Sequence, residues 1–392
     1  MTEAESPAAR PLADALRRAA PALLGYAAVR ALGLLTLAVW SAADGESARR
    51  LLSGRWDSLW YTGVAELGYG YEVRLPNGDV HANLAFFPLL PWLERIVHAV
   101  TPLSYADAGL LVSAVASLAA AWGIFAVADH VHDRRTGICA ALVWAVLPVG
   151  VVQSITYSES LFTALAAWSL YAVLTDRWLT AGLLAASAGL TRPTGVAVAA
   201  ALWVAAITSF VGKRRHGGSA PRADGARPWR RALAMAVAPL GTAGFVLWVG
   251  HRSGGGPLGY LDVQAGWRNG FDGGHAFGRF VAGKLTSFPS ALAGAALIAG
   301  VVLVLSVYVR CVRQGQPPAL LVYTGVVVAL ALCASSYFGS KPRLLLPAFP
   351  LLFPPARVLA RLRTSRSALV LGGVATASAA YGAFWLNGSG PP

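Results

Sequence analysis

Blocks of about twenty apolar residues divide the chain, and they constrain its fold more than any other feature. A helix of that length crosses a hydrocarbon layer of roughly 30 Å. Of the 392 residues, 56% are hydrophobic and only 13% are charged, whereas soluble domains are about one quarter charged. The sequence therefore predicts an all-α polytopic membrane protein.

Runs of low charge predict eleven transmembrane helices. The weakest is 343–358, because four prolines between 347 and 355 would kink or break it, and a partly re-entrant course is the alternative. The predicted spans are 21–43, 107–128, 136–152, 157–175, 178–191, 194–212, 231–250, 289–309, 318–337, 343–358 and 367–386.

The distribution of lysine and arginine predicts the orientation. With the N-terminus inside, the cytoplasmic segments hold 19 of the 32 basic residues and the external segments hold 12. An excess of Lys and Arg on the cytoplasmic side is the rule for such proteins. We therefore expect a multi-pass protein of the cell membrane with a cytoplasmic N-terminus.

The net charge of +14 needs no nucleic-acid partner, because topology and attraction to anionic membrane lipid account for it. We expect residues 1–20 to be a cytoplasmic tail and 21–392 to be one membrane domain. That domain includes two long external loops, 44–106 and 251–288, and a disordered basic cytoplasmic linker, 213–231.

The first external loop contains two amphipathic segments. Within Arg55–Leu67, aromatic and aliphatic residues recur at helical spacing, and Leu84–Val100 holds a second apolar run. Tryptophan and tyrosine favour the headgroup layer. Both segments are therefore predicted to be short helices lying in the outer membrane interface.

One carboxylate in this loop is a candidate catalytic base. Asp57 lies between Trp56 and Trp60, close after the first span, and is suited to take a proton from an acceptor hydroxyl. The alternative is that Asp57 is only the N-cap of a short helix.

Charged residues at other external corners are candidates for substrate binding. Glu159 faces either a cavity or, alternatively, the wet interface as a first-turn helix residue. Arg192, Lys341 and Arg343 could bind a phosphate, and the alternative is contact with lipid headgroups.

Sequence motifs for other chemistries are missing. His130, His132 and Asp133 form the sole histidine cluster, which is more typical of a solvated cytoplasmic loop than of a metal site. No usable nucleotide-binding or nucleophile-elbow motif occurs. We expect no metal and no cofactor.

Five segments occur together in one order. They are R-W-D-S-L-W-Y, N-L-A-F-F-P-L-L-P, T-Y-S-E-S-L-F, L-T-R-P-T-G and K-P-R-L-L-L-P-A-F-P-L-L. In these motifs the chain resembles the PIG-V-like branch of the GT-C glycosyltransferases, over roughly residues 20 to 360. The Ala-, Gly- and Arg-rich composition is similar to that of actinobacterial members.

The resemblance implies a GT-C fold with its catalytic carboxylate, Asp57, in the first external loop. It also implies a polyprenyl-phosphate-sugar donor, usually used without a metal. The second long loop departs from the family pattern, since it is short and glycine-rich. Candidate donor-phosphate residues are Arg343, Lys341 and Arg192, and candidate substrate-binding residues are Trp56, Trp60, Glu159, Tyr157, Asn83, Gln264 and Trp267.

The leading hypothesis is an inverting transfer of mannose from polyprenyl-phosphate-mannose to a hydroxyl of a glycan, glycolipid or other envelope acceptor outside the membrane. One alternative is a transporter of lipid-linked sugars, although such proteins usually have paired broken helices near the midplane. A second alternative is a non-catalytic subunit of a transferase complex.

Overall fold

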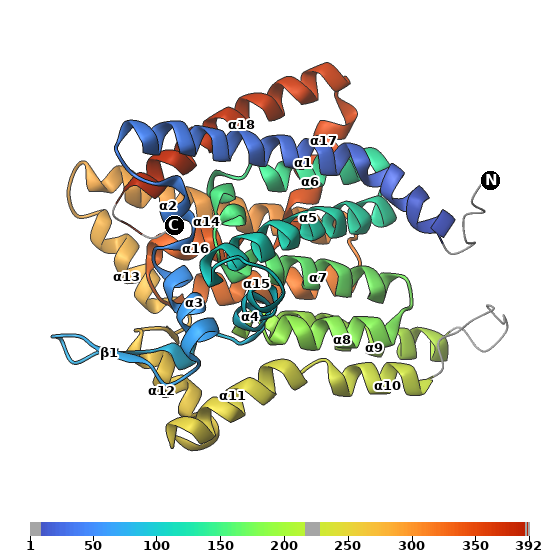
Figure 1. Cartoon of the computed structure of the whole chain (residues 1–392). Coiled ribbons are helices and arrows are strands. Elements are labelled where there is room, and N and C mark those ends of the chain that lie inside the picture. The colour runs from blue at the N-terminus through green and yellow to red at the C-terminus, as the bar shows by residue number, and fades with distance from the viewer. Residues whose placement is uncertain (1–8, 216–227, 389, 391–392) are drawn as a thin grey trace.

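The structure is a computed structural model of the whole chain, and it describes residues 9–215, 228–388 and 390. Long helices run between the two ends of a bundle (Figure 1). Helix α1 (Ala9–Ala43) begins at one end, and α18 (Thr364–Asn387), which packs beside it, finishes at the other. Residues 216–227, within the predicted linker 213–231, lie outside the described residues.

The remaining helices follow the apolar blocks and the loops between them. They are α2 (Ala48–Ser53), α3 (Asp57–Leu67), α4 (Leu89–Val100), α5 (Tyr105–Val131), α6 (Arg134–Ala145), α7 (Ser158–Leu174), α8 (Trp178–Gly189), α9 (Val196–Arg215), α10 (Pro228–Val237), α11 (Leu240–Ser253), α12 (Gly259–Gly266), α13 (His275–Lys284), α14 (Ser290–Arg313), α15 (Pro318–Cys333), α16 (Lys341–Leu344) and α17 (Phe353–Arg361). Short 3-10 turns are η1 (Asn83–Ala85), η2 (Pro148–Ser154), η3 (Pro193–Gly195), η4 (Gly256–Leu258), η5 (Phe338–Ser340) and η6 (Phe349–Leu352).

Each of the eleven predicted spans coincides with an apolar helix or a pair of helices. Five helical segments of the described chain are long and apolar enough to cross a membrane, and two bent pairs bring the number to seven. The other four are shorter apolar helices, such as α7 and α15. The protein is a multi-pass membrane protein, and the number of crossings stays a prediction.

Two predicted spans are bent where prolines interrupt them. The segment 338–361 turns by 74° between its two helices, as the prolines of 343–358 led us to expect. The prediction of one helix over 136–152 is wrong, because α6 ends before Pro148 and η2 leaves at 86°. Proline removes a helical hydrogen bond and clashes with the preceding turn.

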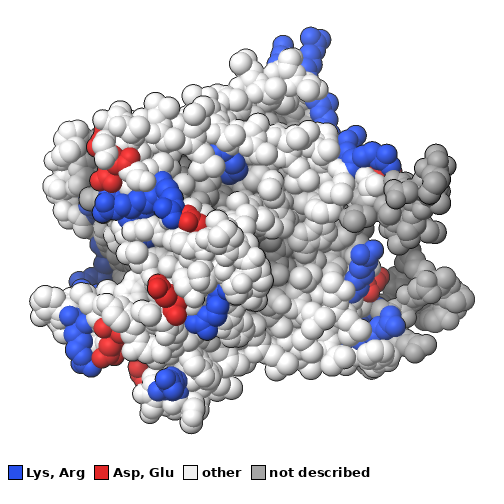
Figure 2. Space-filling view, in the orientation of Figure 1, with Lys and Arg blue, Asp and Glu red and all other residues white. Residues whose placement is uncertain are grey.

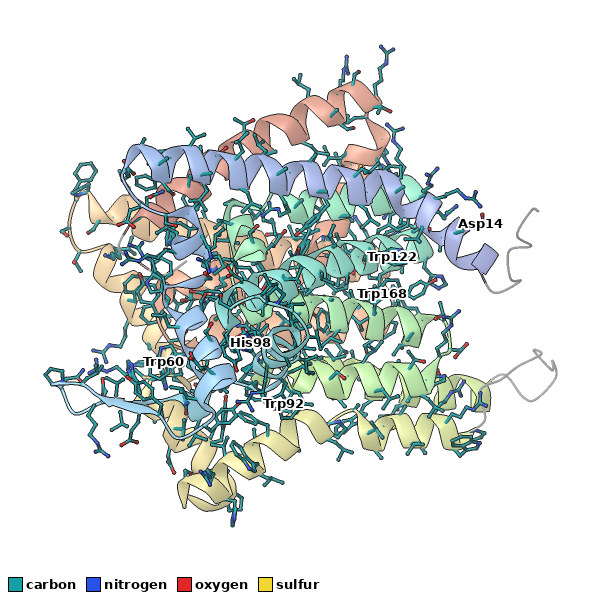
Figure 3. All side chains as sticks on the ribbon, viewed as in Figure 1. Asp14, Trp60, Trp92, His98, Trp122 and Trp168 are labelled. Carbon is teal, nitrogen blue, oxygen red and sulfur yellow. The ribbon has the colours of Figure 1, made fainter. Side chains whose placement is uncertain are left out.

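Small residues let the central helices approach closely. A Cβ added to Gly241 of α11 would lie 1.8 Å from the carbonyl oxygen of Ala186 in α8. Glycine is required there because the two backbones are in contact. Larger side chains fill the wider gaps, as where Trp122 of α5 meets Trp168 of α7 edge-on at 5.3 Å (Figure 3).

The two loops predicted to be external, for which we keep the name external loops, lie at one end of the bundle, here called the site end. The first loop forms α2, α3, η1 and α4, so both predicted short helices are present. Its hairpin pairs β1 (Glu72–Arg74) with β2 (Val80–Ala82), Glu72 opposite Ala82. The second loop contains α12 and α13, which the sequence did not predict, and its strand β3 (Gly270–Phe271) pairs antiparallel with β4 (Ala334–Ser335).

Charge is divided between the two ends of the bundle. In Figure 2, Lys, Arg, Asp and Glu gather at the site end and at the opposite end, and the band between them is almost uncharged. Such a band suits a hydrocarbon layer, because a charge at its centre is costly.

Candidate active site

Asp57 begins helix α3 at the site end. The preceding residue, Trp56, has a φ of 51°, a left-handed conformation that a bulky side chain rarely adopts. Strain of this kind persists only where the surroundings enforce it, and it is common at active sites. The N-cap position belongs to Trp56, so the alternative that Asp57 is merely an N-cap is wrong.

The Asp57 carboxylate is the outermost member of a chain of ion pairs. Its Oδ2 lies 2.9 Å from Nη1 of Arg343, and Nε of Arg343 lies 3.3 Å from Oε1 of Glu159. The same Glu159 oxygen lies 2.5 Å from Nη1 of Arg192. These four residues, here called the ionic network, come from α3, α7, α16 and the turn before η3.

Solvent access decreases from Asp57 inwards. The side chain of Asp57 is 31% exposed, that of Arg343 is 11% exposed and that of Glu159 is 3% exposed. A buried carboxylate is tolerated where cations and hydrogen bonds compensate its desolvation. Glu159, in the first turn of α7, is thus the buried counter-ion of two arginines, and the alternative that places it in the wet interface is wrong.

The arginine nitrogens that form these ion pairs are poorly aligned for hydrogen bonding. Nε and Nη1 of Arg343 and Nη1 of Arg192 are buried, and although each is ion-paired with a carboxylate oxygen, none makes a well-aligned hydrogen bond with the described residues. An unsatisfied buried donor costs free energy. An anion reaching this point would satisfy these donors, and a guanidinium fork matches phosphate oxygens well.

Helix breaks place the members of the ionic network. Residues 155–157 separate η2 from α7, so Glu159 lies in the first turn of α7, where the helix dipole favours negative charge. Arg192 is extended, with a φ of −160°, immediately before Pro193. Arg343 lies in the single turn of α16.

Two tyrosines support the ionic network. The guanidinium carbon of Arg343 lies 4.8 Å from the centre of the Tyr157 ring, a cation–π contact. The Tyr61 hydroxyl donates to Ser158 Oγ at 2.8 Å, and burial raises the pKa of that hydroxyl, so it remains a donor. Tyr61 was not predicted as a site residue, although it follows Trp60 on a segment predicted to be amphipathic.

Lys341 is not joined to the ionic network. Its Nζ donates to the carbonyls of Ala331 at 2.7 Å and Ala334 at 2.9 Å, at the end of α15, and lies over the rings of Phe277 and Phe338. Its three donors already have acceptors in the backbone. The geometry therefore favours a structural role over the predicted phosphate binding.

Trp60 and Trp267 belong to a separate aromatic cluster, formed by Trp60, Tyr71, His81, Phe86 and Trp267. Trp60 stacks on Phe86 at 5.7 Å and meets Trp267 edge-on at 4.8 Å, and His81 stacks on Trp267 at 4.0 Å. The Trp267 Nε1 donates to the carbonyl of Ala82. The cluster joins the two external loops near the position of Trp60 in Figure 3.

Asn83 and Gln264 also hold these loops. Asn83 is buried, accepts from the amide of Gly70 and donates to the carbonyl of Gly68, both at 3.0 Å. Gln264 donates to Tyr260 Oη at 2.7 Å and to the carbonyl of Ala85 at 3.3 Å. Their polar groups are engaged within the protein, which argues against the predicted substrate contacts.

No group of three or more His, Cys, Asp or Glu side chains is placed to bind a metal ion within the part of the chain that the structure describes. The cations of the candidate site are its two arginines.

Comparison with known proteins agrees with this architecture. Residues 81–221 match the family model described as dolichyl-phosphate-mannose-protein mannosyltransferase. Among solved structures, ArnT from Cupriavidus metallidurans bound to undecaprenyl phosphate is similar in fold, with a TM-score of 0.52 and 15% identity. That match covers 90% of this chain and 62% of ArnT. The fold is that of a multi-pass membrane protein and is similar to that of the GT-C glycosyltransferases.

The chain is also similar in sequence to mannosyltransferases. It is 32% identical to GPI alpha-1,6-mannosyltransferase 2 of Mus musculus over 171 residues, and 32% identical to that of Rattus norvegicus over 158 residues. These matches cover 39% and 37% of this chain, and about a third of each relative's length (33% and 30%). The predicted family resemblance and fold class are confirmed.

Proposed function

We propose that this protein is an inverting mannosyltransferase, which moves mannose from polyprenyl-phosphate-mannose to an acceptor hydroxyl at the outer face of the cell membrane. The names of its homologues support mannose, and the undecaprenyl phosphate bound to ArnT supports a polyprenyl-phosphate donor. The acceptor would be a glycan, glycolipid or other envelope component.

One observation carries the proposal. A partly exposed carboxylate, Asp57, contacts a buried arginine, Arg343, which is linked through Glu159 to a second arginine, Arg192. This arrangement can do two things at one place, namely accept a proton at Asp57 and bind a phosphate at Arg343 and Arg192.

The donor phosphate would compete with Asp57 for the guanidinium of Arg343. Once the phosphate is bound, the carboxylate of Asp57 is free to accept the proton of an acceptor hydroxyl. A positioned base contributes about 10² to 10⁴ in rate.

The transfer is a single displacement. The acceptor oxygen forms a bond to the anomeric carbon of mannose, and the bond between that carbon and the phosphate oxygen breaks. Polyprenyl phosphate leaves with the electron pair, stabilised by the arginines, and Asp57 takes the proton. A β-linked donor would yield an α-linked product, and we propose that no metal ion takes part.

Purified protein supplied with radiolabelled polyprenyl-phosphate-mannose and a membrane extract tests the proposal. We expect label to enter an acceptor fraction, with and without a chelator. Label that remains on the donor lipid, or lipid that only crosses between vesicle leaflets, would instead favour a transporter.

The orientation is tested separately. Cysteines introduced near Pro76 and Gly270 should react with impermeant reagents in intact cells, and one near Gly217 should not. Labelling of the Gly217 position alone would overturn the proposed outer-face site.

A further inference from the structure

Glu94 is a buried acidic residue that the proposed chemistry does not use. It lies in the amphipathic helix α4, its exposure is 0%, and both carboxyl oxygens lack hydrogen-bond partners among the described residues. A buried polar group without a partner is rare in proteins. The surroundings of Glu94 therefore need an explanation.

The Glu94 carboxyl lies against α5, beside Thr156. A Cβ added to Gly109 would meet Glu94 Oε1 at 2.9 Å and Thr156 Cγ2 at 2.3 Å. Thr156 Oγ1 is also buried without a partner, as is the hydroxyl of Ser113, one turn further along the same face of α5. Three polar side chains thus gather around one point, where only glycine leaves room for a carboxyl group.

This point adjoins the segment that carries Glu159. The amide of Thr156 donates to the carbonyl of Leu52 at 3.1 Å, and Ser158 accepts from Tyr61. Helices α2 and α3 therefore hold two sides of the turn before α7. Glu94 of α4 is placed to hold a third side of this turn.

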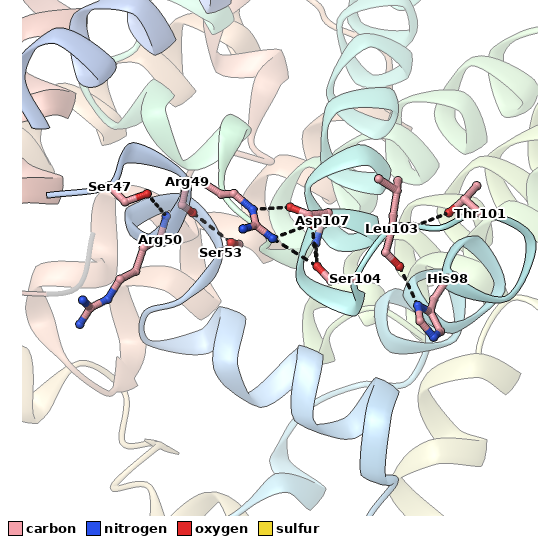
Figure 4. Close-up of polar contacts among 9 residues, drawn as sticks. All are labelled: Ser47, Arg49, Arg50, Ser53, His98, Thr101, Leu103, Ser104 and Asp107. Carbon is pink, nitrogen blue, oxygen red and sulfur yellow. Dashed lines mark hydrogen bonds and ion pairs between the residues drawn. The ribbon is translucent and has the colours of Figure 1, made fainter. Parts of the chain in front are cut away.

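Within the described part of the chain, no charged partner contacts the Glu94 carboxyl. Helix α4 packs against α3 and α5, and the ionisable groups near it on these helices have other partners or are exposed. Figure 4 shows His98 turned to the carbonyl of Leu103, and Asp107 turned to Arg49. Of the others, Asp57 contacts Arg343, Tyr61 donates to Ser158, Arg95 donates to the carbonyl of Ala65, and Glu66 is exposed.

We propose that Glu94 is a positioning residue of the ionic network, acting as a neutral carboxylic acid. Its hydroxyl and carbonyl bond the hydroxyls of Thr156 and Ser113 through buried water, and thereby fix the turn that presents Glu159. Water in such a site is expected where several polar groups converge. Loss of the Glu94 proton in alkaline solution loosens that turn.

The protonation state agrees with this role. Burial raises the pKa of Glu94 from 4.5 to about 9. A group with a raised folded-state pKa binds more protons in the folded state, so its contribution to stability is lost as pH rises from the unfolded pKa through the folded one. For Glu94 that interval is 4.5 to about 9.

The test compares thermal melting of the full chain with that of Glu94→Gln, with Glu66→Gln as a matched exposed control. Glutamine resembles the neutral acid and cannot ionise. We expect the melting temperature of Glu94→Gln, relative to wild type, to increase progressively between pH 4.5 and about 9. A difference that is independent of pH, as expected for Glu66→Gln, would overturn the neutral state of Glu94.

The positioning role rests on the proposed function and has its own readout. Wild type should lose kcat at alkaline pH, and Glu94→Gln should retain it to higher pH with little change in the donor KM. An identical alkaline limb in both proteins would overturn the positioning role. If neither protein transfers sugar, the proposed function fails, and the melting curves still decide the state of Glu94.

Discussion

The ionic network and the aromatic cluster share helix α3 but differ in how their polar groups are used. Asp57 and Trp60 lie one turn apart on that helix, yet Asp57 contacts Arg343 and Trp60 packs on Phe86 and Trp267. The arginines are held by ion pairs with carboxylates, one of which is partly exposed, whereas the Trp267 N–H is bonded to the backbone. Buried arginines beside a partly exposed carboxylate indicate a place for an anionic ligand, and packed rings with a bonded N–H indicate a framework.

This comparison separates the expected effects of substitution. Changes in the ionic network should alter donor use and turnover in a folded protein. Changes in the aromatic cluster should chiefly alter stability.

The largest expected effect is that of Asp57→Asn. Asparagine keeps the size of the side chain but is a poor base, so kcat should fall by about 10² to 10⁴. The exposed Asp262→Asn on α12 is the control and should behave like wild type. Turnover of Asp57→Asn within a few-fold of wild type would remove the base assignment.

Replacing Arg343 by Ala should have the next largest effect. A hydrogen bond to a charged group contributes about 1.5–3 kcal/mol, so kcat/KM for the donor should fall roughly 10- to 100-fold. Replacing Arg343 by Lys should retain only part of the wild-type kcat/KM, because the planar guanidinium fork is lost. The surface residue Arg268, paired with Asp79, is the matched control for replacement by Ala. Unchanged donor kinetics in Arg343→Ala would refute phosphate binding there.

The smallest effect concerns Trp267→Phe in the aromatic cluster. The ring contacts persist in part and the hydrogen bond to Ala82 is lost, which should cost about 0.5–1.5 kcal/mol of stability. Donor KM should stay near that of wild type. A large rise in acceptor KM without loss of stability would instead return Trp267 to substrate binding.

Much of the fold could be predicted from the sequence, because the apolar blocks are long enough to identify helices and some prolines mark where a helix bends. The bend in 343–358 was expected from its prolines, whereas the break at Pro148 was missed within an otherwise continuous apolar run. Helices α12 and α13 were missed because the glycines of that loop resemble a flexible linker.

Charged residues were predicted to lie in the site more successfully than residues chosen for their hydrogen-bonding side chains. Asp57, Glu159, Arg192 and Arg343 were all singled out from the sequence, and the fold brings them together. Lys341 lies in the same motif as Arg343, but its side chain points to the end of α15. That direction depends on tertiary packing, which the motif does not reveal. Glu94 was overlooked because one acidic residue in an amphipathic segment usually faces water.

Our central claim is that the donor phosphate and Asp57 compete for Arg343. The most direct measurement is the equilibrium affinity of purified Asp57→Asn and wild-type protein for polyprenyl phosphate. Removing the carboxylate charge frees the guanidinium, so the account predicts binding as tight as wild type or tighter, in a variant that scarcely transfers sugar. Clearly weaker binding by Asp57→Asn would contradict the account.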